Sequence, residues 1–291
     1  MSWRTVVITG NAKLDYKMDY MVVRKADLTT RIYIGEISML ILESTAISLT
    51  TMLLCELTKY KIKIIFCDEK HNPQSEVLPY YGSHDTSAKI RNQIQWSKEV
   101  KENIWTEIVS EKIKNQGEHL RENELEAQAD MLKEYRKEME LGDQTNREGH
   151  AAKVYFNALF GLDFSRSKEC AINAALNYGY GILLSCFNRE VIANGYITQL
   201  GLFHNNMFNQ FNLSSDLMEP FRILVDRIVM QNKPEKFERE EKMDFIYMLE
   251  DEVVIDGKYQ YVSNAIKIYC RSVFDALNEN DVSLIKFYRT V

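Results

Sequence analysis

Three side chains with the chemistry of metal ligands lie in separate stretches of the sequence. Glu148 lies in "TNREGHAAKVYFNALFG", His204 in "QLGLFHNNMFNQF" and Glu219 in "NLSSDLMEPFRILVDR". Two carboxylates about 4 Å apart repel each other by roughly 4 kcal/mol at a moderate effective dielectric, and a divalent cation reverses that cost. Carboxylate oxygens with one imidazole suit Mg²⁺ or Mn²⁺, the ions that polarise phosphates and activate an attacking oxygen.

Each of these residues also has a purely structural interpretation. Thr145 and Glu148 have the T-x-x-E spacing of a capping box at the start of a helix. His204 is surrounded by apolar residues, as a hydrogen-bonded core histidine would be. Asp216 and Glu219 are residue types favoured at helix starts, where they oppose the positive end of the helix dipole. Taken singly, each pattern favours structure, and only the convergence of three segments in one fold favours a metal site.

The elements that must position these residues fall into two parts, and the first is rich in strands. Three stretches mix β-branched and aromatic residues with partial alternation, as strands do: residues 20–25, 31–42 and 61–68. Residues 46–60 space Leu49, Leu53 and Leu57 as one face of a helix does. Two prolines and Gly82 then close this part, so we place its boundary near residue 82. The pattern predicts a small sheet with one helix.

The second part, which is the remainder of the chain, has the apolar spacing of helices almost throughout. Residues 86–114 begin with a capping threonine or serine and repeat isoleucine at helical intervals. Residues 168–193 are apolar nearly all round, which indicates a central helix whose Gly179 and Gly181 permit close packing of a neighbour. The short stretch 252–261 has strand character.

Length and composition are those of a globular protein. The 291 residues include 45% hydrophobic and 27% charged residues, which excludes a disordered chain. The net charge of -6 does not indicate a protein that binds nucleic acid through an overall basic surface. We expect an α+β protein, with a small N-terminal β-sheet domain at residues 1–82 and a larger all-α domain at residues 83–291 that carries the metal site.

Targeting signals and cysteine motifs are also informative. No apolar run reaches the roughly 18 residues that span a bilayer, and the first residues lack the pattern of a secretory signal. The 5 cysteines are widely spaced and form no C-x-x-C motif of a zinc or redox site. Zinc suits two carboxylates and one imidazole less well than Mg²⁺ or Mn²⁺ does, although the pattern leaves it open. We expect a cytoplasmic protein that has no membrane partner.

Four segments carry a resemblance to a known family: "REGHAAKVYFNALFG", "NAALNYGYGILLSCFNREVIANGY", "LGLFH" and "SSDLMEPFRILVD". In this order and spacing they resemble the CRISPR adaptation integrase family, the metal-dependent subunit that inserts new spacers. The resemblance covers residues 145–230. The order of a sheet followed by helices is also that of the family, and the form of the "LMEPFR" motif is most similar to members from type II systems.

The resemblance implies roles for five residues of this chain. By position, Glu148, His204 and Glu219 correspond to the family's metal-binding acid, histidine and second acid, which hold Mg²⁺ or Mn²⁺. Glutamate at position 219 replaces the aspartate of some relatives and keeps its charge. Asp216 matches a further acid of the same motif and Arg222 the basic residue that follows it, so both are expected to support the site.

The activity that the resemblance implies is DNA strand transfer in antiviral defence. A 3′-hydroxyl end of new spacer DNA attacks a phosphodiester of the repeat in the CRISPR array, and the family also has DNA endonuclease activity. Two alternatives stay open. One is a plain metal-dependent nuclease that acts on branched or single-stranded DNA with water as the nucleophile. The other is a non-enzymatic assembly protein in which the three residues are two helix caps and a core histidine.

The resemblance also implies partners. Double-stranded DNA is expected twice, as spacer precursor and as repeat. Family members form homodimers through the sheet domain, and two dimers flank a small ferredoxin-like adaptation subunit, itself a dimer, in a heterohexamer. In type II systems an effector nuclease and a DNA-end-binding adaptation protein also take part.

Overall fold

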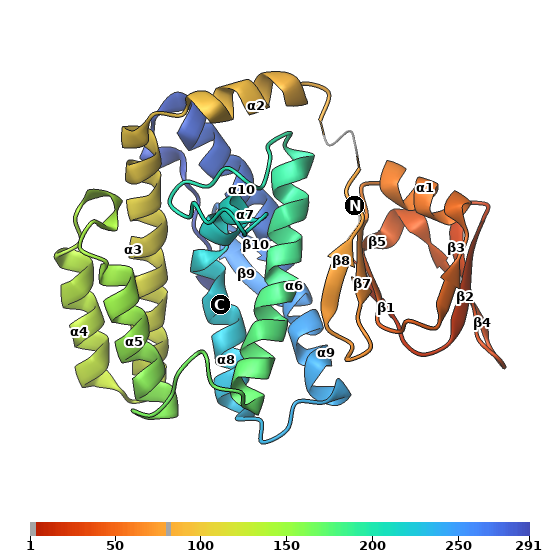
Figure 1. Ribbon diagram of the computed structural model, residues 1–291, viewed down its shortest axis with the longest axis horizontal. Helices are drawn as coiled ribbons and strands as arrows, with labels where there is room; N and C mark the ends of the chain where they lie inside the picture. Colours follow the sequence, from red (N-terminus) through yellow and green to blue (C-terminus); the bar gives the residue numbers. More distant parts are fainter. Residues whose placement is uncertain (1–3, 80–82) are drawn as a thin grey trace.

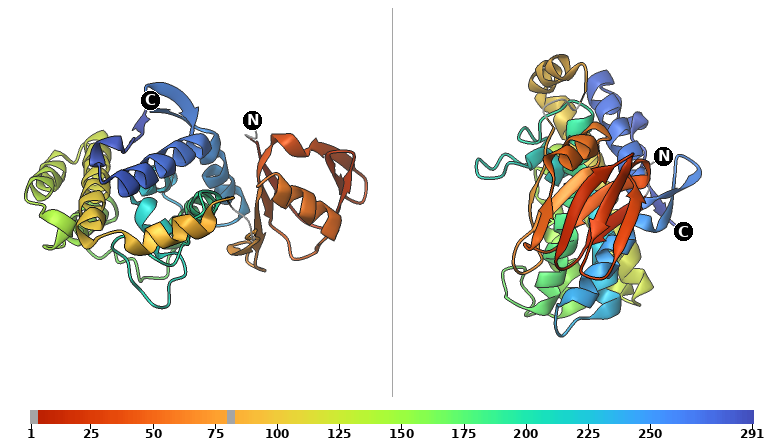
Figure 2. Two further views of the ribbon diagram at one scale, coloured as in Figure 1. Left: turned by 90° about the horizontal axis from the view of Figure 1, so that it is seen from above. Right: turned by 90° about the vertical axis from the view of Figure 1, so that its right-hand side faces the viewer.

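The structure is a computed structural model that describes residues 4–79 and 83–291. Two parts lie side by side along its long axis (Figures 1 and 2): a strand-rich half, residues 4–79, and a helical half, residues 83–291. The fold class predicted from the sequence is confirmed. The predicted boundary near residue 82 lies outside the described residues.

The strand-rich half contains two four-stranded sheets and one helix. The elements are β1 (Arg4–Ile8), β2 (Ala12–Lys17), β3 (Tyr20–Arg24), β4 (Thr29–Tyr33), η1 (Ile34–Glu36), β5 (Ile37–Leu42), β6 (Ile47–Leu49), α1 (Thr51–Lys59), β7 (Lys63–Cys67) and β8 (Pro73–Glu76). We call β1-β5-β7-β8 the inner sheet and β4-β3-β2-β6 the outer sheet. In the inner sheet, β5 pairs in parallel with both β1 and β7, whereas β8 is antiparallel to β7.

The inner sheet is covered on both faces, because the outer sheet and α1 pack on one face and the helical half on the other (Figure 1). All six residues of β5 are buried. Leu40 and Leu42 join the core shared with α1, whereas Met39 and Ile41 join the core of the helical half. Parallel strands that are covered on both faces read as continuous apolar runs, as "ISMLIL" does.

The helical half consists of a central helix, α6, with the other helices around it (Figure 1). The elements are α2 (Thr86–Gln95), α3 (Lys98–Glu122), α4 (Glu126–Lys137), η2 (Leu141–Asp143), α5 (Arg147–Phe160), α6 (Ala171–Ala193), α7 (Asn212–Leu217), η3 (Glu219–Phe221), α8 (Arg222–Asn232), α9 (Arg239–Tyr247), η4 (Met248–Glu250), β9 (Glu252–Ile255), β10 (Lys258–Tyr261), α10 (Val262–Glu279), η5 (Val282–Leu284) and β11 (Arg289–Thr290). Strands β9, β10 and β11 form a small antiparallel sheet. The strand character predicted for residues 252–261 is therefore confirmed.

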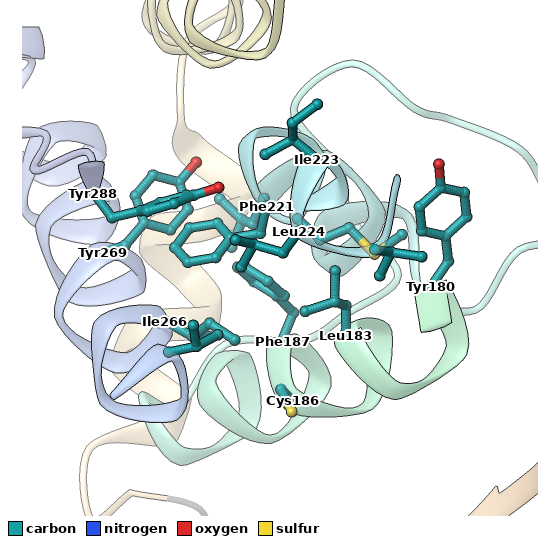
Figure 3. Close-up of a cluster of buried hydrophobic side chains, with 14 of the residues drawn as sticks. Tyr180, Leu183, Cys186, Phe187, Phe221, Ile223, Leu224, Ile266, Tyr269 and Tyr288 are labelled. Atoms are coloured by element: carbon teal, nitrogen blue, oxygen red, sulfur yellow. The ribbon is translucent and has the colours of Figure 1, made fainter. Parts of the chain in front are cut away.

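Helix α6 is the predicted central helix, and it packs against α8, α9 and α10 as well as the inner sheet. A Cβ at Gly179 would lie 2.5 Å from Val225 and 2.6 Å from Phe245, so close packing of α8 and α9 requires glycine there. Gly181 has no such neighbour within 3.4 Å, and its predicted role is wrong. Figure 3 shows Phe187 of α6 beside Phe221 in a cluster of buried hydrophobic side chains. The centroids of the two rings lie 5.4 Å apart.

Four local predictions were wrong. Residues 31–42 are not one strand, because η1 separates β4 of the outer sheet from β5 of the inner sheet. Residues 86–114 are not one helix, because the chain breaks at Trp96 and α3 restarts with Ser97 as its N-cap. The single predicted sheet is two sheets, and residues 47–49 of the predicted helix form β6. In each case, pairing with distant strands or helices decides a boundary that local periodicity cannot show.

A candidate metal centre

Helix α3 forms the floor of the candidate site, and it carries a buried lysine there. Ile104, Ile108 and Lys112 follow one another at intervals of four residues on the buried face of the helix. Lys112 is only 8% exposed. A buried ammonium needs counter-charges, and two carboxylates from other segments supply them.

Those carboxylates are Glu148 and Glu219. The Lys112 ammonium forms an ion pair with Oε1 of Glu148, in the first turn of α5, and lies 2.5 Å from Oε2 of Glu219, in η3. The other oxygen of Glu219, Oε1, accepts a hydrogen bond of 2.9 Å from Nε of Arg222. The fold therefore brings together two acids that lie 71 positions apart in the sequence, numbers 148 and 219, around one cation.

Glu148 is free to face Lys112 because another residue satisfies the start of its helix. The carboxylate of Asp143 accepts hydrogen bonds from the backbone N–H groups of Arg147, at 2.7 Å, and Glu148, at 3.0 Å. Asp143 thus takes the place that the T-x-x-E pattern assigned to Thr145 and Glu148. The capping-box interpretation of Glu148 is wrong, since no side chain of the N-cap residue, Asn146, bonds to the helix.

Glu219 is fixed through the backbone of the residue that follows it. The carbonyl oxygen of Pro220 accepts hydrogen bonds from Asn115 of α3, at 3.2 Å, and from the Tyr288 hydroxyl, at 3.3 Å. The ring of Phe221 is fully buried. Glu219 opens a short 3-10 turn ahead of α8, and both its carboxylate oxygens face cations rather than backbone N–H groups. Helix capping therefore does not explain it.

His204 is held by Asp216. Nδ1 of His204 lies 2.5 Å from Oδ1 of Asp216, whose side chain is fully buried. The same carboxylate accepts hydrogen bonds from three successive backbone N–H groups, those of Leu202, Phe203 and His204, at 2.6 to 3.2 Å. With Nδ1 engaged, Nε2 is the nitrogen left for a ligand or a proton.

The His204 ring lies at the mouth of the site rather than in the core. Its side chain is 41% exposed, and the ring packs edge-on against Trp105 of α3. Phe203 stacks on the same Trp105 with ring centroids 4.6 Å apart. The core-histidine interpretation is therefore wrong.

Gly201 allows the loop before His204 to close over Asp216. A Cβ at this position would lie 2.4 Å from the carbonyl oxygen of His204 and 2.7 Å from Oδ2 of Asp216. A larger residue would push the loop off the carboxylate that orients His204. The "LGLFH" stretch therefore needs glycine for the geometry of the site.

The charges in the site shift one another's pKa values. Burial raises the pKa of Glu219, but Arg222 and Lys112 outweigh it and hold that pKa at about 2. Burial likewise opposes the charge of Lys112, yet Glu219 and Glu148 raise its pKa overall. The hydrogen bond to Asp216 raises the pKa of His204. Glu219 is therefore ionised at neutral pH, as a metal ligand must be.

A second buried network lies behind Arg222. Its guanidinium stands 4.7 Å from the ring centroid of Tyr180, whose hydroxyl bonds to Asp226. Burial raises the pKa of Asp226 to about 6. His119 of α3 lies 2.7 Å from the Tyr155 hydroxyl, and burial lowers the pKa of this histidine to about 4.

The donors of the site suit a hard divalent ion. Within residues 4–79 and 83–291, no three His, Cys, Asp or Glu side chains lie close enough together to hold a metal ion in this conformation. The acids nevertheless already share one cation, the buried ammonium of Lys112. An imidazole whose other nitrogen is held by a carboxylate is the usual arrangement of a ligating histidine. The donor types of Glu148, Glu219 and His204 are therefore those that suit Mg²⁺ or Mn²⁺.

Comparison with known proteins decides the family. Residues 5–254 match the family described as "CRISPR associated protein Cas1". The chain belongs to the Cas1 family. The resemblance to CRISPR adaptation integrases is thereby confirmed.

Individual Cas1 relatives agree. A CRISPR-associated endonuclease Cas1 of Neisseria meningitidis serogroup C (strain 8013) is 34% identical over 230 residues, covering 79% of this chain and 76% of the relative. A casposase bound to integration product has a TM-score of 0.75 at 18% identity, with 97% of this chain and 93% of that chain covered. A Cas6-RT-Cas1–Cas2 complex has a TM-score of 0.76 at 18% identity, with 99% of this chain covered but only 36% of that chain. The two structures show that the fold is shared.

Three residues of the site were missed from the sequence: Lys112, Asp143 and Gly201. One signal pointed to Lys112, since it continues the apolar stripe of Ile104 and Ile108 where another apolar residue was expected. Asp143 and Gly201 act through contacts with backbone atoms. Their short-range patterns resemble those of ordinary turns.

None of the helices among the described residues is long and apolar enough to cross a membrane.

Proposed function

We propose that this chain is a metal-dependent DNA integrase of CRISPR adaptation. It joins the 3′-hydroxyl ends of new spacer DNA to the repeat of the CRISPR array by transesterification, and it also acts as a DNA endonuclease. The observation that carries the proposal is the convergence of Glu148 and Glu219 on one buried cation, beside a histidine oriented by Asp216, in a chain of the Cas1 family. The likeness to a casposase bound to integration product supports strand transfer over hydrolysis alone.

Glu148, His204 and Glu219 would hold Mg²⁺ or Mn²⁺, which polarises the phosphate and offsets the charge that grows on it. The chain's own residues prepare this site. Arg222 keeps Glu219 ionised in a buried place, and Asp216 directs the Nδ1 proton of His204 away from the reaction, so that Nε2 serves as ligand or proton acceptor. The attacking group belongs to the DNA, and therefore no side chain acts as the nucleophile.

The proposed partners follow from family membership. They are double-stranded DNA, a second copy of this chain bound through the strand-rich half, and a small ferredoxin-like subunit in a heterohexamer, with an effector nuclease and a DNA-end-binding protein as further type II components. The likeness to the Cas6-RT-Cas1–Cas2 complex supports an adaptation assembly. The net charge of -6 fits DNA contact confined to a strip of such an assembly.

The test is a joining reaction. Purified protein and its small partner subunit are mixed with a labelled duplex bearing free 3′-hydroxyls and a repeat-containing plasmid, with Mn²⁺ or with chelator. His204→Ala and Glu219→Ala are expected to lower joining by more than about 100-fold, because even outer-shell partners of a metal cost roughly 10- to 100-fold. Asp216→Asn is expected to lower joining by roughly 10- to 100-fold, as the loss of an outer-shell partner does.

Exposed His150 of α5 offers a matched control, and His150→Ala should join DNA as the wild type does. Cleavage without joined product would favour a plain nuclease. Joining that survives both alanine substitutions would place the active site elsewhere.

A further inference from the structure

Lys112 occupies the position that the proposed function gives to a metal ion. Its ammonium contacts one oxygen of Glu148 and one oxygen of Glu219, the two acids of the proposed ligand set. These two acids are called the carboxylate pair below. Lys112 is the one residue of α3 whose side chain forms an ion pair with either of them among the described residues.

The two cations at Glu219 divide its carboxylate between them. Arg222 bonds to Oε1, whereas the Lys112 ammonium contacts Oε2, which is buried. Arg222 is anchored three residues from Glu219 in the same segment and packs on the Tyr180 ring. Lys112 is attached to a different helix. The Lys112 side of the carboxylate is therefore the side at which one cation can replace another without disturbing the Arg222 contact.

The chemistry of lysine suits an exchangeable contact. Its ammonium is a compact point charge on a flexible four-carbon chain, whereas the planar guanidinium of an arginine would form two parallel hydrogen bonds to a carboxylate. Glu148, the outer member of the carboxylate pair, has a side chain that is 28% exposed, so water and ions reach this end of the contact. A divalent ion and an ammonium repel each other, and both cannot lie between the same two carboxylates.

We infer that Lys112 is the exchangeable counter-ion of the carboxylate pair: it holds Glu148 and Glu219 together in the metal-free protein, and the divalent ion must displace it to bind. Lys112 is thus a positioning residue that sets the metal affinity of the site. The inference rests on the proposed function only in assigning the carboxylate pair to a metal.

Direct Mn²⁺ binding tests this role. Free Mn²⁺ is measured by electron paramagnetic resonance while the full-length chain is titrated, for the wild type, Lys112→Met and the control Lys114→Met. Lys114 lies on the same helix and pairs with Glu111 instead of the carboxylate pair. Lys112→Met is expected to bind Mn²⁺ at least tenfold more tightly, because the competing ammonium is gone, whereas Lys114→Met should match the wild type. Glu148→Gln added to Lys112→Met should abolish the gain.

A measurement on the wild-type chain covers the case in which Lys112→Met fails to fold. Lysines are labelled by reductive methylation, with chelator or with saturating Mg²⁺, and each site is quantified by peptide mass spectrometry. Lys112 is expected to be protected in chelator and to label several-fold faster with Mg²⁺. Lys63, which is buried beside Glu76 away from the site, should stay protected in both conditions.

The outcomes separate the two proposals. The exchange role would be overturned if Lys112→Met bound Mn²⁺ no more tightly than the wild type. It would also be overturned if Mg²⁺ did not change the rate at which Lys112 is labelled. Neither result would contradict the metal site. Absence of Mn²⁺ binding by both the wild type and Lys112→Met at millimolar ion would overturn the metal site itself, and the exchange role with it.

Discussion

Two buried lysines have pKa values that are shifted in opposite directions. One lies in the candidate site and the other at the junction of the two halves. Lys112 is 8% exposed and Lys63 of β7 is 3% exposed. Burial lowers the pKa of Lys63, although Glu76 beside it partly opposes the shift. Burial also disfavours the charge of Lys112, yet two carboxylates raise its pKa. The second counter-charge, rather than the depth of burial, decides whether a buried ammonium is stable.

His119 extends the comparison to a buried base whose ring nitrogen bonds a neutral group. Its Nδ1 lies 2.7 Å from the Tyr155 hydroxyl. Burial, with a further contribution from the nearby Arg227, lowers its pKa to about 4. The pKa is thus raised for the lysine beside two acids, and lowered both for the lysine beside one acid and for the histidine beside a neutral hydroxyl. Of these three buried bases, only Lys112 faces two carboxylates.

The largest effect is expected from removing the inner acid of the site. Glu219→Gln leaves the buried Lys112 and the partly buried Arg222 with less counter-charge, which should cost about 3–5 kcal/mol of unfolding free energy in chelator. Glu148→Gln should cost less, since Glu148 is partly exposed and Glu219 still faces Lys112. Urea unfolding of both variants measures the difference. Equal losses of unfolding free energy in the two variants would contradict the larger contribution that we assign to Glu219.

The next effect concerns pH. Because the pKa of His119 falls from 6.5 unfolded to about 4 folded, the fold excludes its charged form and loses stability as pH falls from 6.5 to 4. The loss attributable to His119 is up to about 3 kcal/mol. His119→Gln should remove it, as measured by urea unfolding across this pH range.

The pKa shift of Asp226 changes stability with pH in the opposite direction, over a pH range that overlaps that of His119. Its pKa is raised from 3.8 to about 6, so the contribution of Asp226 to the free energy of unfolding is lost as pH rises between those values. The quantity to compare is therefore the difference between wild type and His119→Gln at each pH. A difference that does not change between pH 6.5 and 4 would contradict the assignment.

The smallest effect is expected at the junction. Lys63→Met combined with Glu76→Gln removes a buried ion pair and keeps an acceptor for Asn188, which donates a hydrogen bond to Glu76. Such replacements are often neutral or stabilising, so we expect a change within about 1 kcal/mol or a gain. Thermal unfolding measures it. A loss as large as that of Glu219→Gln would mean that one counter-charge suffices.

Sequence patterns predicted the parts of the fold that are decided locally. The all-round apolar character of residues 168–193 marked α6 as the central helix, and it is. The stretch "RIYIGEISMLIL" misled, because its apolar residues belong to two different sheets and only the partners of each strand reveal the change. Periodicity reports which face is buried, and it does not report what covers that face.

In the site too, the sequence predicted residue types but not the contacts between distant segments. The types of Glu148, His204 and Glu219 suggested a metal, and the fold places the two acids on one cation, but their ligand roles stay a prediction. The partners of Lys112 could not be predicted from "EKIKNQ", because they lie 36 and 107 positions away, at 148 and 219. A contact between distant segments leaves no local pattern except an odd residue in an apolar stripe.

The inner sheet makes the two halves of the molecule interdependent. Within β5, Leu40 and Leu42 belong to one core, and Met39 and Ile41 belong to the other. If the helical half unfolded alone, it would leave one face of this sheet in water, and every apolar Å² so exposed would cost about 25 cal/mol. Six consecutive residues therefore tie the strand-rich half and the helical half into one cooperative unit, in which damage to either core destabilises both.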